Sequence, residues 1–234
     1  MLFRSHQTQQ DPEAPVFSKY AYGTDYHFVM KKKLRKLFEF IKTFTGPCNA
    51  RPFTDSAPVL EKAWGQRGGL GWIGKNSNLI SPQHGSFFFI GELILDVELP
   101  FGKPRLVRDH CGNCTRCIDA CPTKAIVADR IVDARKCISY QTIELKGDMD
   151  ENLKGKFKNR VFGCDICQDV CPWNLKSVPH EESDLSPNPY VLQLSSNEWF
   201  NISHPRFNEL FKNSAVNRIG YNGIKRNLHF IQKS

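Results

Sequence analysis

The cysteines of this chain constrain its fold more than any other feature, because eight of the nine form two ordered sets. The first set follows the spacing C-x2-C-x2-C-x3-C-P and consists of Cys111, Cys114, Cys117, Cys121 and then Pro122. Bacterial two-cluster ferredoxins bind [4Fe–4S] clusters through this spacing. The second set repeats the end of the run and consists of Cys137, Cys164, Cys167, Cys171 and Pro172. The pattern predicts a protein that moves electrons one at a time.

The spacing also predicts how the two sets share their ligands. In two-cluster ferredoxins the fourth cysteine of each run binds the cluster of the other run. One [4Fe–4S] cluster is therefore expected on Cys111, Cys114, Cys117 and Cys171. The other is expected on Cys121, Cys137, Cys164 and Cys167. This crossed arrangement would hold the clusters close enough for fast electron transfer.

Two other uses of cysteine compete with this interpretation. Structural zinc is also bound by C-x2-C pairs, but four ligands satisfy zinc and nothing in such a site requires the longer run. Disulfides are typical of secreted proteins, and no signal peptide is recognisable in the sequence. We therefore favour two [4Fe–4S] clusters. Cys48 is left over and is assigned no role.

The charge of the chain favours an anionic partner. The net charge is +8 and the pI is about 9.0, and nucleic acid is the commonest large anion. The alternative is that the positive charge only maintains solubility. Basic residues gather after Pro205 and in residues 30–36, although the second group is better explained as the solvated face of a helix. The composition is typical of a globular protein without a membrane span, and reduced cysteines favour a cytoplasmic location.

Hydrophobic periodicity and turn residues predict the main elements. We expect residues 1–18 to be extended or poorly ordered, and residues 29–44 to form a helix. A second helix is expected to start at Ser56 and Pro58 and to end near Gln66, before Gly68 and Gly69. Residues 87–99 have the composition of a buried strand, and residues 181–189 form a polar connection. From Tyr190 onward the chain is predicted to be helical, with an apolar stripe at Phe207, Leu210 and Phe211.

Several polar groups precede the cysteines and suggest chemistry beyond electron transfer. Asp55 stands before a predicted helix, where a carboxylate usually caps. It could instead face an apolar pocket and act as a general acid. Tyr26 and His27 are either a surface pair or a contact to a substrate or proton. The glycines of residues 71–76 could allow close approach of a large cofactor, but they are not a dinucleotide-binding fingerprint.

Five ordered motifs resemble epoxyqueuosine reductase. They are YAYGTDYH at 20–27, DSAPVLEK at 55–62, GLGWIGKN at 69–76, DARKCISY with TIE at 133–140 and 142–144, and GCDICQ with VCPWN at 163–168 and 170–174. The resemblance extends from about Tyr20 to the C-terminus. It implies reduction of epoxyqueuosine to queuosine at the wobble position of tRNA, the last step of queuosine synthesis. It also implies cobalamin in addition to the two clusters, and a relationship to reductive dehalogenases.

The same resemblance implies roles for individual residues. Asp55 matches the proton donor of the family and is expected beside cobalamin. Residues next to the second cluster are expected to touch the corrin, namely Ser139, Cys164 and Asp165. Leu79 and Ile90 match positions that line the cobalamin pocket. Lys146 and the basic C-terminal tail are candidates for contact with tRNA. The chain has no Asp-x-His-x-x-Gly signature, so cobalamin is expected in its base-off form.

The fold expected from these observations is α+β or α/β. Residues 1–107 would form a partial cobalamin- and substrate-binding α/β domain, 108–178 a dicluster ferredoxin-like domain, and 179–234 a linker with a short basic helical tail. Members of the family usually carry several dozen more residues before the motif at 20–27. We therefore expect this chain, expressed alone, to bind cobalamin poorly or to fold incompletely. A flavodoxin- or ferredoxin-type electron donor and a monomeric state are also expected.

Two other functions remain open from the sequence. The chain could be a dicluster ferredoxin-type electron carrier without substrate chemistry of its own. It could also be a reductive dehalogenase of small molecules, which would predict an export signal and no surface for an anionic partner. Binding to undermodified tRNA would separate the reductase from both alternatives.

Overall fold

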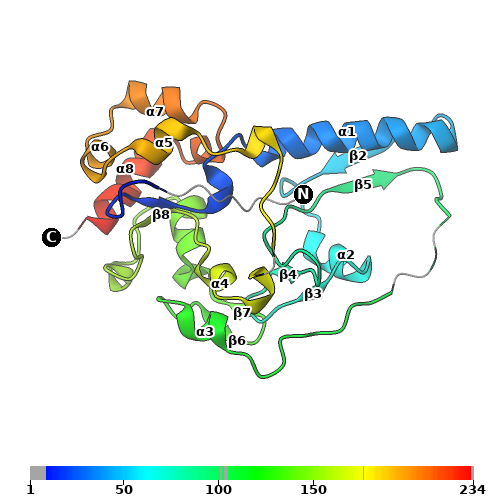
Figure 1. Cartoon of the computed structure of the whole chain (residues 1–234), viewed down its shortest axis with the longest axis horizontal. Coiled ribbons are helices and arrows are strands. Elements are labelled where there is room, and N and C mark those ends of the chain that lie inside the picture. The colour runs from blue at the N-terminus through cyan, green and yellow to red at the C-terminus, as the bar shows by residue number, and fades with distance from the viewer. Residues whose placement is uncertain (1–8, 101, 103–104, 176, 233–234) are drawn as a thin grey trace.

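The strands form separate two-stranded pairs instead of one continuous sheet (Figure 1). The computed structural model describes residues 9–100, 102, 105–175 and 177–232. Within them, β1 (Val16–Phe17) pairs in parallel with β8 (Arg160–Phe162). The other pairs are antiparallel: β2 (Ala50–Phe53) with β5 (Glu92–Leu95), β3 (Trp72–Ile73) with β4 (Leu79–Ile80), and β6 (Ile126–Ala128) with β7 (Ile131–Val132). The structure therefore contains both helices and strands, but no extended α/β sheet in its described part.

The helices fall into three groups along the chain. The N-terminal group is α1 (Tyr26–Thr45) and α2 (Glu61–Arg67). Two short helices among the cysteines are α3 (Arg116–Ala120) and α4 (Ile166–Asp169). The C-terminal group is α5 (Pro189–Gln193), α6 (Ser196–Phe200), α7 (His204–Phe211) and α8 (Gly220–Ile231). Figure 1 shows this last group gathered at the end of the molecule opposite the tip of α1.

Helix α1 confirms the helix expected over 29–44. The Asp25 side chain accepts a hydrogen bond from the backbone N–H of His27 and so caps its start. Its lysines face solvent, and Lys33 pairs with Glu182 of the polar connection. The predicted apolar stripe is buried only in its first half. Towards the C-terminal end Phe44 remains 74% exposed.

The largest hydrophobic core joins parts of the chain that are far apart in sequence. Phe17, Phe162 and Trp199 pack together with the predicted stripe of α7, whose members Phe207, Leu210 and Phe211 are all buried. Residues 1–18 were expected to be extended or poorly ordered: Val16–Phe17 is extended as β1 and Phe17 is buried in this core, while residues 1–8 lie outside the described residues. A two-residue strand is too short to show a periodic pattern, and the nearby Pro12 and Pro15 indicated an irregular segment.

The C-terminal helices pack tightly onto the cysteine-rich segment. Asn227 of α8 is completely buried, and its amide donates to the carbonyls of Thr142 and Val161 at 2.8 Å each. Arg226 donates to the carbonyl oxygens of Leu145 and Gly147. The C-terminal helices are consequently part of the framework that supports the cysteine loops. The sequence had suggested only a short helical tail.

Two predicted boundaries differ from the structure. Helix α2 begins at Glu61 and not near Pro58, because Asp55 takes a left-handed backbone conformation (φ 50°) and the next residues form bends. Its end at Gly68 is as predicted. The buried strand expected over 87–99 is reduced to β5, while Phe87 is buried outside any strand and packs with α1.

Candidate functional site

Two cavities border the two predicted groups of cysteines. The larger has a volume of about 470 Å³ and is lined by Cys121, Cys137, Cys164 and Cys167. The smaller has a volume of about 320 Å³ and is lined by Cys111, Cys114, Cys117 and Cys171. The structure thus brings together the same two groups of four, including the exchange of Cys121 and Cys171 between the runs. All eight have free thiols, so the structure offers no support for disulfides.

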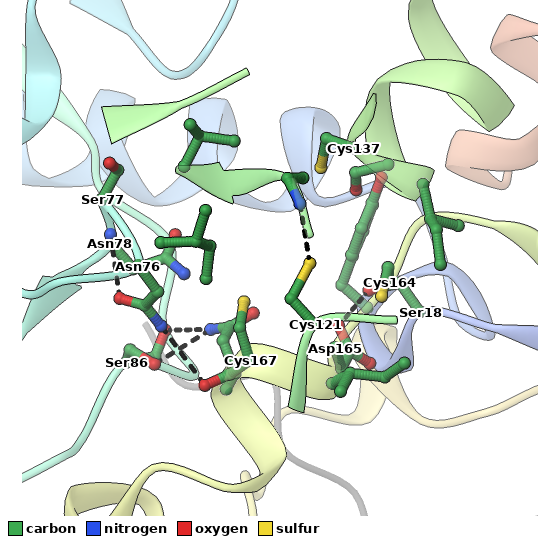
Figure 2. Close-up of a pocket in the computed structure, with 18 of the residues that line it drawn as sticks. Ser18, Asn76, Ser77, Asn78, Ser86, Cys121, Cys137, Cys164, Asp165 and Cys167 are labelled. Carbon is green, nitrogen blue, oxygen red and sulfur yellow. Dashed lines mark hydrogen bonds between the residues drawn. The ribbon is translucent and has the colours of Figure 1, made fainter. Parts of the chain in front are cut away.

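Short turns carry the four sulfurs of the larger cavity to one place (Figure 2). Cys121 follows α3, and its Sγ accepts the backbone N–H of Ala125 at 3.2 Å. Cys137 ends a 3-10 turn whose start is capped by Asp133. Cys164 and Cys167 flank the start of α4. Burial raises the pKa of Cys164 to about 11 and also raises that of Cys167, so these thiols keep their protons until a metal displaces them.

The donor chemistry of both cavities fits a [4Fe–4S] cluster. Each cavity is bordered by four thiols, the ligand set of such a cluster. In the described part of the chain, no three His, Cys, Asp or Glu side chains converge as they would around a single metal ion. N–H groups also point at the sulfurs, as the Ala125–Cys121 contact shows. Such contacts are typical around metal-bound thiolates.

A carboxylate and a phenol border the larger cavity together with the cysteines. Asp55 and Tyr26 both line it, and the Tyr26 O–H donates to Asp55 Oδ2 at 2.6 Å. The backbone N–H of Asp55 donates to the carboxylate of Glu61. Asp55 does not cap α2, whose N-cap residue is Leu60, so the capping interpretation is wrong. Asp55 is exposed at the edge of the cavity and is not enclosed in an apolar pocket.

Tyr26 is held in place by aromatic rings, which makes it more than a surface residue. Its ring stacks on Phe89 with centroids 4.1 Å apart and planes 5° from parallel. Burial and the Asp55 carboxylate raise the pKa of Tyr26, so it remains a protonated donor. Asp25 fixes the neighbouring imidazole, with 2.7 Å between its Oδ1 and His27 Nδ1. The three phenylalanines at 87–89 could have indicated this aromatic packing around Tyr26, but their composition was interpreted as a buried strand.

The remaining predicted residues occupy different places. Ser139 and Asp165 line the larger cavity. The carboxylate of Asp165 accepts hydrogen bonds from the Ser18 hydroxyl and the Lys19 backbone N–H, and burial raises the pKa of Asp165. Leu79 and Ile90 are absent from the described lining of this cavity. Leu79 is buried in β4, and the Ile90 carbonyl accepts the Thr54 hydroxyl at 2.9 Å.

The positive charges proposed for a nucleic acid are distributed unevenly. Lys146 is exposed but does not line either cavity. Arg218 pairs with Glu144, and Arg206 with Glu209, so these tail cations have internal partners. Sequence reasoning missed Lys62, which lines the larger cavity and donates to the Ser77 carbonyl at 2.9 Å. No helix in the described ranges is long and apolar enough to cross a membrane.

Comparison with known proteins adds independent findings. Residues 110–174 match the family described as 4Fe-4S double cluster binding domain, and residues 3–56 match epoxyqueuosine reductase QueG, DUF1730. The chain is 52% identical over 226 residues to the epoxyqueuosine reductase of Cellulophaga algicola. The aligned region covers 97% of this chain and 73% of that protein. The segment 110–174 is thus an iron–sulfur domain for two clusters.

Solved structures agree with this similarity. A crystal structure of epoxyqueuosine reductase with a tRNA-Tyr epoxyqueuosine-modified stem loop matches with a TM-score of 0.87 and 30% identity. The enzyme from Bacillus subtilis, with its catalytic aspartate loop swung out of the active site, matches with a TM-score of 0.85 and 30% identity. Each match covers 97% of this chain and 60% of the solved one. The chain therefore spans about three fifths of the length of these structures.

Proposed function

Because this chain belongs to the epoxyqueuosine reductase family of oxidoreductases, we propose that it reduces epoxyqueuosine to queuosine at the wobble position of tRNA. One observation carries the proposal. A single cavity joins the four thiols of Cys121, Cys137, Cys164 and Cys167 to the Asp55–Tyr26 pair. A cluster held by these thiols would bring electrons to the space that the Asp55 carboxyl borders, and this carboxyl would supply the proton. An electron carrier without substrate chemistry has no need for the second.

The larger cavity also fits the reactive part of a base-off cobalamin. Aromatic groups and Ser139 line it together with the thiols and Asp55, and no histidine is among the described lining residues. Ser139, Cys164 and Asp165 would lie against the corrin, with Asp55 at the edge of the cavity. Cobalamin would supply a strongly reducing centre for C–O cleavage. Leu79 and Ile90 would contribute only through the packing around the cavity.

The residues of the chain would then divide the work of the reaction. Converting an epoxide to an alkene takes two electrons and two protons and releases the oxygen as water. Electrons from a flavodoxin- or ferredoxin-type donor would enter at the smaller cavity and reach the larger one through the crossed cysteines. Asp55 would give a proton to the departing oxygen, and Tyr26 would hold the carboxyl in position. Exposed cations such as Lys146 would meet the tRNA.

Changing Tyr26 to phenylalanine tests the positioning of Asp55. The variant keeps the ring that stacks on Phe89 but loses the O–H that donates to Asp55. A hydrogen bond between neutral groups contributes about 0.5–1.5 kcal/mol, so we expect turnover to fall about two- to tenfold. Single-turnover rates on epoxyqueuosine-containing tRNA measure this. The exposed Tyr190 provides a matched control, Tyr190→Phe, which should retain full activity. Equal rates for Tyr26→Phe and the control would contradict the assignment.

An anaerobic assay tests the function itself. The chain is reconstituted with iron and sulfide, supplied with excess cobalamin and a low-potential reductant, and mixed with tRNA that contains epoxyqueuosine. We expect queuosine to form only when cobalamin is present, and no change in tRNA that lacks epoxyqueuosine. Clusters that cycle between redox states without any queuosine, in protein shown to have cobalamin bound, would favour the dicluster electron carrier.

A further inference from the structure

A tryptophan contacts one of the cluster-forming sulfurs directly. The indole N–H of Trp72 donates to Cys111 Sγ, with 3.4 Å between nitrogen and sulfur. An indole nitrogen can only donate, so the direction of this hydrogen bond is unambiguous. Trp72 is 1% exposed, and Cys111 is half-buried. The residue stands outside the larger cavity and takes no part in the proton chemistry proposed above.

The surrounding structure fixes the indole from several sides. Trp72 lies in the hairpin of β3 and β4, opposite Ile80. A side chain on the preceding Gly71 would come within 2.0 Å of the Ile80 carbonyl oxygen, so this close pairing requires glycine. The indole ring meets His110 edge-on at 5.1 Å and Trp173 at 5.0 Å. These two rings belong to the segments that carry Cys111 and Cys171. The donor is therefore tied to the sulfurs of the smaller cavity.

A fixed N–H next to a ligating sulfur changes the energy of the two redox states unequally. Reduction adds a negative charge to a [4Fe–4S] cluster, and a donor at a sulfur stabilises the more negative state. Hydrogen bonds to the sulfurs are among the factors that set the potential of such clusters. The effect is larger in a buried site, where the dielectric constant is low. Loss of the donor should lower the potential.

We propose that Trp72 raises the reduction potential of the cluster bound by Cys111, Cys114, Cys117 and Cys171, and so helps this cluster accept electrons from the donor protein. Trp72 is a positioning residue in this role and touches no substrate. The proposal depends on the double cluster domain and not on the reaction with tRNA. Its test can therefore fail or succeed independently of the proposed function.

The first test is a redox titration of the reconstituted protein, followed by electron paramagnetic resonance. In Trp72→Phe we expect the midpoint potential of one cluster to shift to a more negative value, while the other stays unchanged. Trp64, which is 57% exposed on α2, supplies the matched control Trp64→Phe, for which neither potential should move. Unchanged potentials in a Trp72→Phe protein with its full iron content would overturn the proposal.

A second measurement avoids the risk that the variant loses its cluster. The unaltered protein is prepared with ¹⁵N in the indole rings of tryptophan, and the reduced clusters are studied by pulsed hyperfine spectroscopy. We expect a ¹⁵N coupling to one cluster, and its retention in labelled Trp64→Phe. Absence of any indole coupling in the fully loaded protein would overturn the proposal, whatever the behaviour of Trp72→Phe.

Discussion

Replacement of Asp55 by asparagine should abolish queuosine formation while both iron–sulfur spectra stay intact. Asparagine has nearly the same size, and its amide oxygen can still accept the hydrogen bond from Tyr26. It cannot release a proton to the oxygen of the epoxide. General acid catalysis typically accounts for about 10²–10⁴-fold in rate, so turnover should fall by about that factor. The measurement is the single-turnover rate with epoxyqueuosine-containing tRNA and bound cobalamin.

A matched substitution distinguishes this effect from a change in charge. Asp148 is exposed and lies outside both cavities, so Asp148→Asn should leave the rate unchanged. Because Asp55 is not one of the expected cluster ligands, the visible and paramagnetic spectra of Asp55→Asn should equal those of the unaltered protein. Activity of Asp55→Asn near that of Asp148→Asn would show that another group delivers the proton.

Replacement of Cys121 by alanine should remove the cluster of the larger cavity. In sequence Cys121 belongs to the first run, but in the structure it lines the cavity of Cys137, Cys164 and Cys167. We expect the iron content to fall from about eight to about four atoms per chain. The remaining spectrum should equal that of Cys137→Ala. The reciprocal variant Cys171→Ala should instead match Cys114→Ala, since both residues line the smaller cavity.

Cys48 provides the control for this comparison, because it lines neither cavity. Cys48→Ala should keep its full iron content and both spectra. If the ligands were not exchanged between the runs, Cys121→Ala would resemble Cys114→Ala, and the crossed assignment would be wrong. Iron analysis and paramagnetic spectra of the five variants decide between the two arrangements.

Local spacing allowed the sequence to predict the cysteine groups and the main helices. The turns that carry metal ligands are short, so the distances between Cys111, Cys114 and Cys117 along the chain determine which cavity they border. Helical periodicity likewise predicted α1 and the buried stripe of α7, because one face of each packs on a core. The helical stripes and the spacing within each run depend on residues close in sequence, whereas the grouping of Cys171 with Cys111 followed from the ferredoxin pattern.

Features that depend on distant partners were not predictable. Ser56 and Pro58 fit the pattern of a helix start, but α2 begins at Glu61, and the Asp55 side chain accepts a hydrogen bond from Tyr26 on another helix. Strand β1 has only two residues, and its pairing with β8 leaves no trace in the local sequence. The role of Trp72 was also missed, because its hydrogen bond to Cys111 joins residues 39 positions apart.

The largest core has a consequence for how the protein matures. It is built from residues 14–21, β8 and the C-terminal helices, and among its described members there is no cysteine. We therefore expect residues 14–21 and the C-terminal helices to pack together before iron arrives. Delivery of iron and sulfide to the cysteines would then require ordering of only the loops around the two cavities. By the same reasoning, oxidative loss of iron would leave a shaped apoprotein that can be reloaded instead of degraded.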